Sequence, residues 1–323
     1  MRKLVLLCVL CCLGPLSSQE DPKLEPVEEP WFTGPLIAPV GTAVPYGEFL
    51  IKSYLFCSAN TGVYNRGSTP IPTDNNFYST KSQFLCFFGL NPWCDINISP
   101  EFYYNYFSGE RYFYPGDLTV GLDFQLMSDK ETPYFPGIKF SVREVLPTGN
   151  FQYLRPRKLW TDRTGAGTFG TQFDLVLYKE FHLSGAHFLS TTVSGEYTVN
   201  THLNVHGFNA YGGGFGAKGK VFPGNRFQGI VSFEVSLTQH WSLALDTVYS
   251  FTEATTFSGN PGIAFSGLLA TVGSPSAKQV SFAPAIEYNF SKKMGLIAGC
   301  HLSAWGKNSP EFRSGVVNFT YKY

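Results

Sequence analysis

The sequence predicts an all-β protein, an antiparallel transmembrane β-barrel of about 12 strands, and three observations support this fold class. The first is the segment 227–251, where two stretches of alternating apolar and mostly polar residues flank a turn at Gln239 and His240. Such alternation predicts a β-hairpin with one apolar and one polar face. Each strand would have about ten residues, and a bilayer core requires tilted strands of about 9–11 residues. The apolar face would then meet lipid, and the polar face would line a lumen.

Composition gives the other two observations. Aromatic residues make up 16% of the 323 residues, including 30 Phe and 18 Tyr, and membrane barrels carry aromatic girdles at both interfaces. Charged residues are only 15% of the chain, below the roughly 25% of ordinary soluble domains. Outside the N-terminus the sequence has no stretch of 18 apolar residues, which excludes helical membrane spans. With 24 basic and 24 acidic side chains the net charge is zero, so the composition indicates no nucleic-acid partner.

The N-terminus is typical of a secretory signal peptide, which we place at residues 1–18. Arg2 and Lys3 precede an apolar core at 4–13, and we expect cleavage after Ser18. In an alternative interpretation, Cys12 is the lipid acceptor of a lipoprotein. Secretion together with a barrel fold predicts insertion into the outer membrane of a Gram-negative bacterium.

Residues 19–46 are rich in proline, which opposes both regular strands and helices. We therefore interpret this segment as a periplasmic tail. Two arrangements stay open at this point. The tail is either tucked into the mouth of the barrel through Trp31, Phe32 and Leu36, or it is a disordered leader.

Residues 47–323 form the predicted barrel. Its twelve strands are expected at 47–57, 80–89, 94–106, 117–127, 137–146, 168–180, 187–199, 227–238, 241–252, 280–290, 293–304 and 313–323. Short connections alternate with mostly long ones, as in barrels with short periplasmic turns and long outer loops. The longest are expected at 58–79, 147–167, 200–226 and 253–279. This alternation places both termini in the periplasm. Ten or fourteen strands remain as alternatives, because the second, third and fifth strands alternate poorly.

The last strand carries a separate signal. Val317, Phe319, Tyr321 and Tyr323 fall on one face, and Tyr323 is the final residue. An alternating apolar strand that ends in an aromatic residue resembles the signal by which the barrel-assembly machinery recognises outer-membrane barrels. The alternative is an ordinary edge strand that ends at an aromatic residue.

The middle of the chain resembles a known family. Val145–Asn150, with the sequence VLPTGN, ends a predicted strand, Gly165–Thr168 lies in the following loop, and Gln172–Leu175 and Gly195–Tyr197 follow in the next strands. This order is similar to the outer-membrane barrels named for the MetA protein of phenol-degradation pathways, over about residues 135–320. The resemblance implies a barrel that contributes to the uptake of small solutes, often aromatic or apolar. It implies no catalytic residue.

The alternation that turns apolar rows outward turns charged residues inward. The expected lumen-lining residues are Asp123, Lys139, Arg143, Asp174, Glu196, Glu234, Asp246, Glu287 and His301, with Lys52 as a further counter-charge. An excess of carboxylates would favour cations over anions, because rings of one sign select the opposite ion. The leading hypothesis is a passive channel or uptake barrel for small solutes. The alternatives are a structural polar network without transport and a surface-exposed structural or adhesin-like barrel.

Catalytic and cofactor motifs are matched only in part. The segment Gly165–Gly170 has the glycine spacing of a dinucleotide site, and Gly214–Lys220 spells a phosphate-binding loop, but neither is followed by a helix. His301 and Ser303 share a strand face with Asn318 on the next strand, which is the residue set of outer-membrane phospholipases. A lipid hydrolase is therefore a remote third hypothesis. Otherwise the sequence predicts no enzyme, no metal site and no cofactor.

Two cysteines flank an expected tight turn near Leu90. Cys86 and Cys94 are equidistant from it, so they would face each other across the hairpin in an oxidising compartment. The sequence leaves two alternatives, a disulfide between them or two reduced apolar cysteines.

Overall fold

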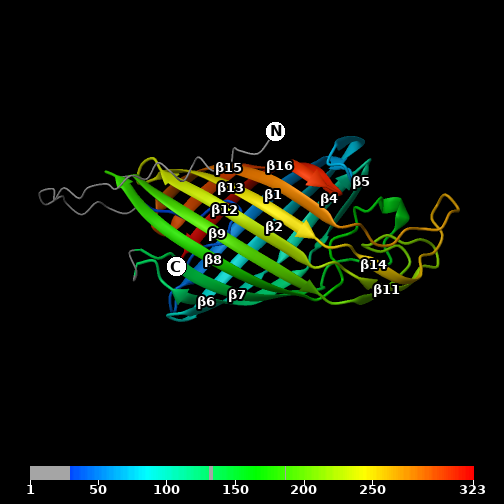
Figure 1. The fold of residues 1–323 in the computed structure, drawn as a ribbon, viewed down its shortest axis with the longest axis horizontal. Coiled ribbons are helices and arrows are strands. Elements are labelled where there is room, and N and C mark those ends of the chain that lie inside the picture. The colour runs from blue at the N-terminus through cyan, green and yellow to red at the C-terminus, as the bar shows by residue number, and fades with distance from the viewer. Residues whose placement is uncertain (1–29, 131–133, 186) are drawn as a thin grey trace, which may run out of the picture.

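The computed structural model describes residues 30–130, 134–185 and 187–323, and these residues form one closed antiparallel sheet (Figure 1). Its strands are β1 (Phe49–Tyr64), β2 (Pro70–Asn91), β3 (Cys94–Ser99), β4 (Glu101–Phe107), β5 (Glu110–Pro115), β6 (Leu118–Met127), β7 (Gly137–Leu146), β8 (Gly170–Ser184), β9 (His187–Asn200), β12 (Arg226–Ser236), β13 (Trp241–Thr252), β15 (Ala277–Ser291), β16 (Met294–Lys307) and β17 (Ser309–Lys322). The ring closes because β1 pairs with β17 as well as with β2.

These fourteen segments occupy twelve positions around the barrel. β3 and β4 both pair with β2, and only Pro100 separates them, since proline has no N–H to donate to the ladder. β5 pairs with β4, and β6 pairs with β3. β5 and β6 therefore continue one another across Gly116 and Asp117. The predicted twelve-stranded antiparallel barrel is therefore confirmed.

The two ends of the barrel differ. Short turns follow β2, β6, β8, β12 and β15 at one end, which we call the turn end, and β17 finishes there. Long connections follow β7, β9 and β13 at the other end, which we call the loop end (right in Figure 1). They carry a small sheet of β10 (Leu203–His206), β11 (Lys218–Phe222) and β14 (Thr256–Asn260), and the 3₁₀ turn η1 (Pro156–Lys158).

One connection differs from the prediction. The long outer loop expected at 58–79 is mostly strand, because β1 and β2 continue their pairing up to Tyr64 and Pro70 around a short turn. The first eight residues of β2 are exposed or half-buried on both faces. A strand that meets solvent on both sides has no apolar row, so period-2 alternation could not reveal it.

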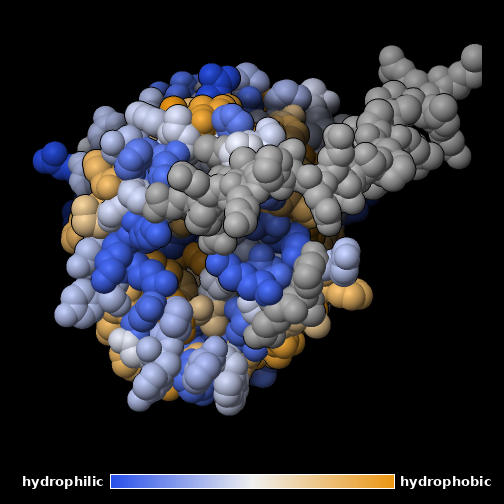
Figure 2. Space-filling view, turned by 90° about the vertical axis from the view of Figure 1, so that its left-hand side faces the viewer, coloured by the Kyte–Doolittle hydropathy of each residue, from blue (hydrophilic) through white to orange (hydrophobic). Residues whose placement is uncertain are grey.

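Side chains of the barrel wall alternate as expected. In β13, Trp241, Leu243 and Leu245 are exposed to the outside, whereas Ser242, Ala244 and Asp246 between them are buried. Hydrophilic residues gather around the mouth at the turn end, and hydrophobic residues show at the flanks (Figure 2). An apolar outer face with a polar inner face is the pattern of a membrane-spanning barrel. Within the described ranges, no helix is both long enough and apolar enough to span a membrane.

The N-terminal region of the chain runs inside the barrel and packs against its wall. Leu36 is fully buried against inward-facing Tyr54, Ala244, Ile297 and Val316 of the wall. Ala38, two residues later, packs on wall residues of β12 and β13. The interior of a membrane barrel is usually polar. Here the apolar wall residues that contact Leu36 and Ala38 form an apolar patch where the N-terminal region packs.

Leu245 tests which face meets lipid. Replacing Leu245 by Arg should lower the free energy of unfolding by about 2–4 kcal/mol if the residue lies near the bilayer midplane, because a lipid-facing cation loses its hydration. The neighbouring inward change Asp246→Asn keeps an oxygen acceptor and should have little effect on folding. Urea unfolding in lipid vesicles would measure both variants, and equal losses would contradict the assignment of faces.

Candidate functional site: the lumen and the segment inside it

The N-terminal residues 30–48, here called the inner segment, enter and leave the lumen at the turn end. The Trp31 ring packs edge-on against His240 in the turn after β12, with 4.8 Å between ring centroids. At its other end, the backbone of Phe49 bonds reciprocally with Tyr323. Prolines at 30, 35, 39 and 45 keep the segment from pairing as a strand. Its backbone N–H groups therefore need partners among the wall side chains.

Carboxylates of the wall supply those partners. The backbone N–H and the hydroxyl of Thr33 both donate to Glu287 Oε1, each at 2.6 Å. The backbone N–H groups of Ile37 and Ala38 donate to Asp246 Oδ2, at 2.5 and 3.4 Å. Two of the acidic residues predicted to line an open lumen thus hold the inner segment, and are committed to it rather than to a passing ion.

Two further anchors were missed from the sequence. The N–H of Val44 donates to Asp95 Oδ2, and the N–H of Ala43 donates to Gln125 Oε1, both at 2.7 Å. Alternation in the sequence could have placed Asp95 in the lumen, since Asp95, Asn97 and Ser99 form a buried polar row that alternates with the exposed Ile96 and Ile98. That row is only three residues long.

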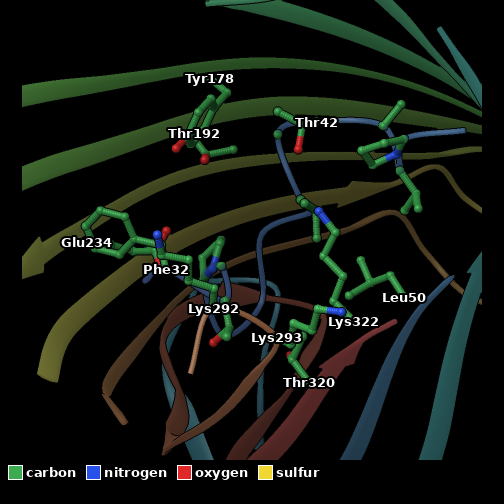
Figure 3. Close-up of a pocket in the computed structure, with 18 residues that line it drawn as sticks. Phe32, Thr42, Leu50, Tyr178, Thr192, Glu234, Lys292, Lys293, Thr320 and Lys322 are labelled. Atoms are coloured by element: carbon green, nitrogen blue, oxygen red, sulfur yellow. The ribbon is translucent and has the colours of Figure 1, made fainter. Parts of the chain in front are cut away.

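Close backbone contact fixes the middle of the inner segment. At Gly41, a Cβ atom would lie 2.4 Å from Cβ of Tyr178 on β8, so no other residue fits there. A cavity of about 220 Å³ borders this contact on the turn side, and Figure 3 shows Phe32 and Thr42 beside Tyr178, Thr192 and Glu234 of the wall. Lys292, Lys293 and Lys322 line its outer rim.

A larger cavity, of about 490 Å³, lies on the other side of the inner segment, which contributes 36–40 to its lining. On one side, β1 and β2 contribute the apolar and aromatic residues Tyr54, Phe56, Leu85 and Phe87, and also the polar residues Lys52, Lys81 and Gln83. The opposite side comes from β7, β8 and β9 and carries Lys139, Arg143, Asp174 and Glu196. The inner segment lies between the two cavities and lines both of them.

The charged side of this cavity is an ion-pair network. Asp123 is 0% exposed and Lys139 1% exposed, and Lys139 Nζ lies 3.4 Å from Asp123 Oδ2. Arg143 reaches Asp123 Oδ1 at 3.2 Å and Asp174 Oδ2 at 3.7 Å. Asn97 adds a hydrogen bond to Asp123. Buried charges of this kind are tolerated only when paired, so the network fixes β6, β7 and β8 relative to one another.

Glu234 and Lys52 are two further buried charged residues of the barrel interior. Both side chains are buried, and Ser190 donates a hydrogen bond to Glu234 Oε2. The ammonium group of Lys52 points at the inner segment, where a Cβ on Gly34 would lie 3.3 Å from it. Glu196 is only half-buried and borders the larger cavity. Its Oε1 accepts a hydrogen bond from the hydroxyl of Thr198 at 3.5 Å.

The predicted His301 set does not assemble. His301 Nε2 is 2.8 Å from Oγ of Ser281, not of Ser303, and Ser303 instead bonds to the backbone of Phe312. Asn318 accepts a hydrogen bond from Thr320. Strand register explains this outcome, because Ser281 lies directly opposite Ser303, and Asn318 faces Ile297. The geometry therefore lacks the hydrolase arrangement that the spacing suggested.

Of the two alternatives for Cys86 and Cys94, the structure agrees with two reduced cysteines, since both are free. The hairpin turns at Pro92 and Trp93 rather than at Leu90, so Cys86 lies opposite Ile98 and Cys94 opposite Asn91. Across the described ranges, no three His, Cys, Asp or Glu side chains are placed to hold a metal ion. The residues proposed as an assembly signal, Val317, Phe319, Tyr321 and Tyr323, are exposed on the outer face of the barrel end.

The fold of this chain is similar to that of a solved outer membrane channel, although its sequence matches no known family. The sequence matches no protein-family model and no curated protein. The solved structure of the COG4313 outer membrane channel from Pseudomonas putida F1 superposes with a TM-score of 0.68 at 14% identity, over 88% of this chain and 98% of that chain. The translocator domain of the autotransporter NalP from Neisseria meningitidis gives a TM-score of 0.44 at 10% identity, over 87% of this chain and 90% of that chain. The protein therefore has the fold of an outer-membrane β-barrel.

Proposed function

We propose that the protein is an uptake channel for small solutes whose lumen is gated by the inner segment. The observation that carries the proposal is a closed barrel with two internal cavities, of about 490 and 220 Å³, and a single segment between them. That segment is held mainly by hydrogen bonds to Glu287, Asp246, Gln125 and Asp95 and by the packing of Leu36. Displacing it would join the two cavities without altering any strand pair.

The larger cavity supports a solute class. Its lining combines aromatic and aliphatic side chains with charged and amide side chains, so it would suit a small molecule with an apolar ring and one polar substituent. The resemblance to the MetA-type barrels implies the same kind of solute. The likeness in fold to an outer membrane channel is consistent with transport.

Proteoliposome swelling tests transport itself. Vesicles that contain the protein should swell in small neutral solutes faster than empty vesicles, and the rate should fall steeply as the solute approaches the dimensions of the cavities. Rates equal to those of empty vesicles for every solute, including with the inner segment removed, would contradict the channel proposal.

Orientation follows from the asymmetry of the ends. In this proposal the loop end faces the exterior and the turn end the periplasm, with a signal peptide at 1–18 that lies outside the described residues. A cysteine placed within 205–220 or 256–275 should be labelled by an impermeant reagent on intact cells. A cysteine at position 239 or 292 should react only after the outer membrane is opened, and the reverse pattern would overturn the orientation.

A surface-exposed adhesin-like barrel is the second candidate. One observation favours it, because Phe265, Leu268 and Leu269 at the loop end are each more than 70% exposed. Large exposed apolar residues commonly mark contact sites. Binding of cells or purified proteins that is lost when Leu268 and Leu269 are both changed to Ser, with solute flux unaffected, would favour this candidate over the channel.

A further inference from the structure

Three loops that are distant in sequence meet at the loop end and line an open pocket of about 410 Å³, which we call the loop pocket. It is separate from the lumen cavities and shares no lining residue with them. Its lining comes from the connections after β7, β9 and β13, and includes Leu154, Leu159, Trp160, Phe208, Phe265 and Ala264.

Backbone hydrogen bonds build the loop pocket in advance of any ligand. Leu154 N–H donates to Phe208 O at 2.9 Å, which joins the first loop to the second. Gly213 N–H donates to Thr271 O at 2.9 Å, and Phe215 and Ile263 exchange a pair of bonds that join the second loop to the third. Tyr211 donates its hydroxyl to Ala166 O, and burial raises the pKa of Tyr211 to about 12, which keeps the proton on this donor.

The glycine run 212–214 permits this convergence. Gly212 has φ of 117°, and a Cβ there would lie 2.2 Å from Thr271 O. A Cβ on Gly214 would lie 2.2 Å from Ile263 O. Gly214, the first glycine of the apparent phosphate-binding loop, thus serves with Gly212 to let two loop backbones touch.

Backbone strain is concentrated on the same site. Leu159 and Trp160 are consecutive residues with positive φ, 49° and 69°, although neither is glycine. Such conformations are strained and tend to persist at functional sites. Both side chains line the loop pocket and remain partly exposed. The strained turn therefore keeps two large apolar groups at a cavity rather than in a core.

The lining of the loop pocket is mainly apolar and holds one charged residue. Arg155 is the charged residue of the lining, and its Nε lies 3.7 Å from Asp162 Oδ2 while its guanidinium stacks 5.3 Å from the Tyr112 ring centroid. With its charge balanced by Asp162, Arg155 adds little attraction for an anion. Phe208 and Phe265 stack at 5.6 Å between centroids, and Phe215 meets both edge-on. Aromatic edges and faces of this kind favour another ring.

We propose that the loop pocket binds a neutral aromatic molecule of one or two rings on the outer side of the membrane. Its volume is above the roughly 150 Å³ that holds benzene in an apolar protein cavity and lies within the range of small-molecule sites. Binding itself does not depend on transport. The inference that such a molecule next enters the lumen rests on the proposed channel function.

Quenching of Trp160 fluorescence by bromobenzene tests the proposal with the full chain in lipid nanodiscs. The heavy atom should quench a saturable fraction of the emission, and Trp160→Phe should remove that fraction. Probe dissolved in lipid also reaches Trp93, Trp241 and Trp305 on the outer barrel face, but that quenching is not saturable. Naphthalene should compete for the saturable fraction, whereas 2-naphthoate should compete much less.

Ala264→Phe fills the pocket and should weaken bromobenzene binding by about tenfold or more, a loss of about 1.4 kcal/mol. Leu268→Ala is the matched control, because Leu268 lies in the same loop, is 71% exposed and does not line the pocket. The affinity of the Leu268→Ala variant for bromobenzene should stay at the wild-type value. A lack of saturable quenching in the wild type, equal binding by Ala264→Phe, or equal competition by 2-naphthoate would each overturn the proposal. So would a dimer in solution that Ala264→Phe dissociates, since the pocket would then be an interface. Binding without solute flux would leave this inference standing and contradict the channel.

Discussion

Removal of the inner segment should open the barrel. A variant that lacks residues 31–45 is expected to raise proteoliposome swelling rates and single-channel conductance by about tenfold or more, as expected for a twelve-stranded barrel that loses its plug. The physical reason is that these residues separate the two lumen cavities, and they are held mainly by side-chain hydrogen bonds and packing rather than by a strand ladder. Conductance in planar bilayers gives the measurement.

A point variant guards against a deletion that fails to fold. Gly41→Phe cannot be accommodated beside Tyr178 and should displace the inner segment in a full-length chain, with a smaller increase in conductance. Conversely, a cysteine pair at Ala38 and Ile230, which pack together, should lock the segment and lower the flux until it is reduced, in a background without the native cysteines. Conductance that is the same in the deletion, the point variant and the locked form would contradict gating by this segment.

The second large effect is expected at Asp123. Asp123→Ala should destabilise the barrel by about 3–5 kcal/mol, because it leaves Lys139 and one contact of Arg143 buried without their counter-ion. Unfolding in urea with tryptophan fluorescence as the probe would measure the loss. Asp123 is fully buried, so solvent cannot replace the missing charge.

Two comparisons make this prediction specific. Glu196→Gln removes a carboxylate that borders the larger cavity and lacks an ion pair as close as those of Asp123, so it should cost far less. The double change Asp123→Ala with Lys139→Met should recover part of the stability lost in Asp123→Ala, because it removes the stranded ammonium group as well. A double variant that is as unstable as the sum of its parts would show that the two charges act independently.

The sequence by itself determined the barrel. Period-2 alternation in β12 and β13 places each side chain on a defined face, because a pleated strand turns successive residues to opposite sides. Asp246 and Glu234 could therefore be placed inside, and Leu245 outside, before any contact was known. A count of about twelve strands also came from alternation and turn residues, which are local properties of the chain, but ten or fourteen stayed open because three of the strands alternate poorly.

Contacts between distant segments were decided only by the tertiary structure. Asp246 and Glu287 were expected to attract ions, but they bind backbone N–H groups of residues that lie more than 200 positions earlier. Because the hairpin turns at Pro92 and Trp93, the register of β2 with β3 keeps Cys86 and Cys94 from lying opposite each other. The register of β15 with β16 likewise places Ser281, rather than Ser303, as the partner of His301. The loop pocket likewise needs three loops at once. Alternation fixes the face on which a residue lies, whereas its partner depends on register and on which segment fills the space, and both are set by packing across the closed barrel.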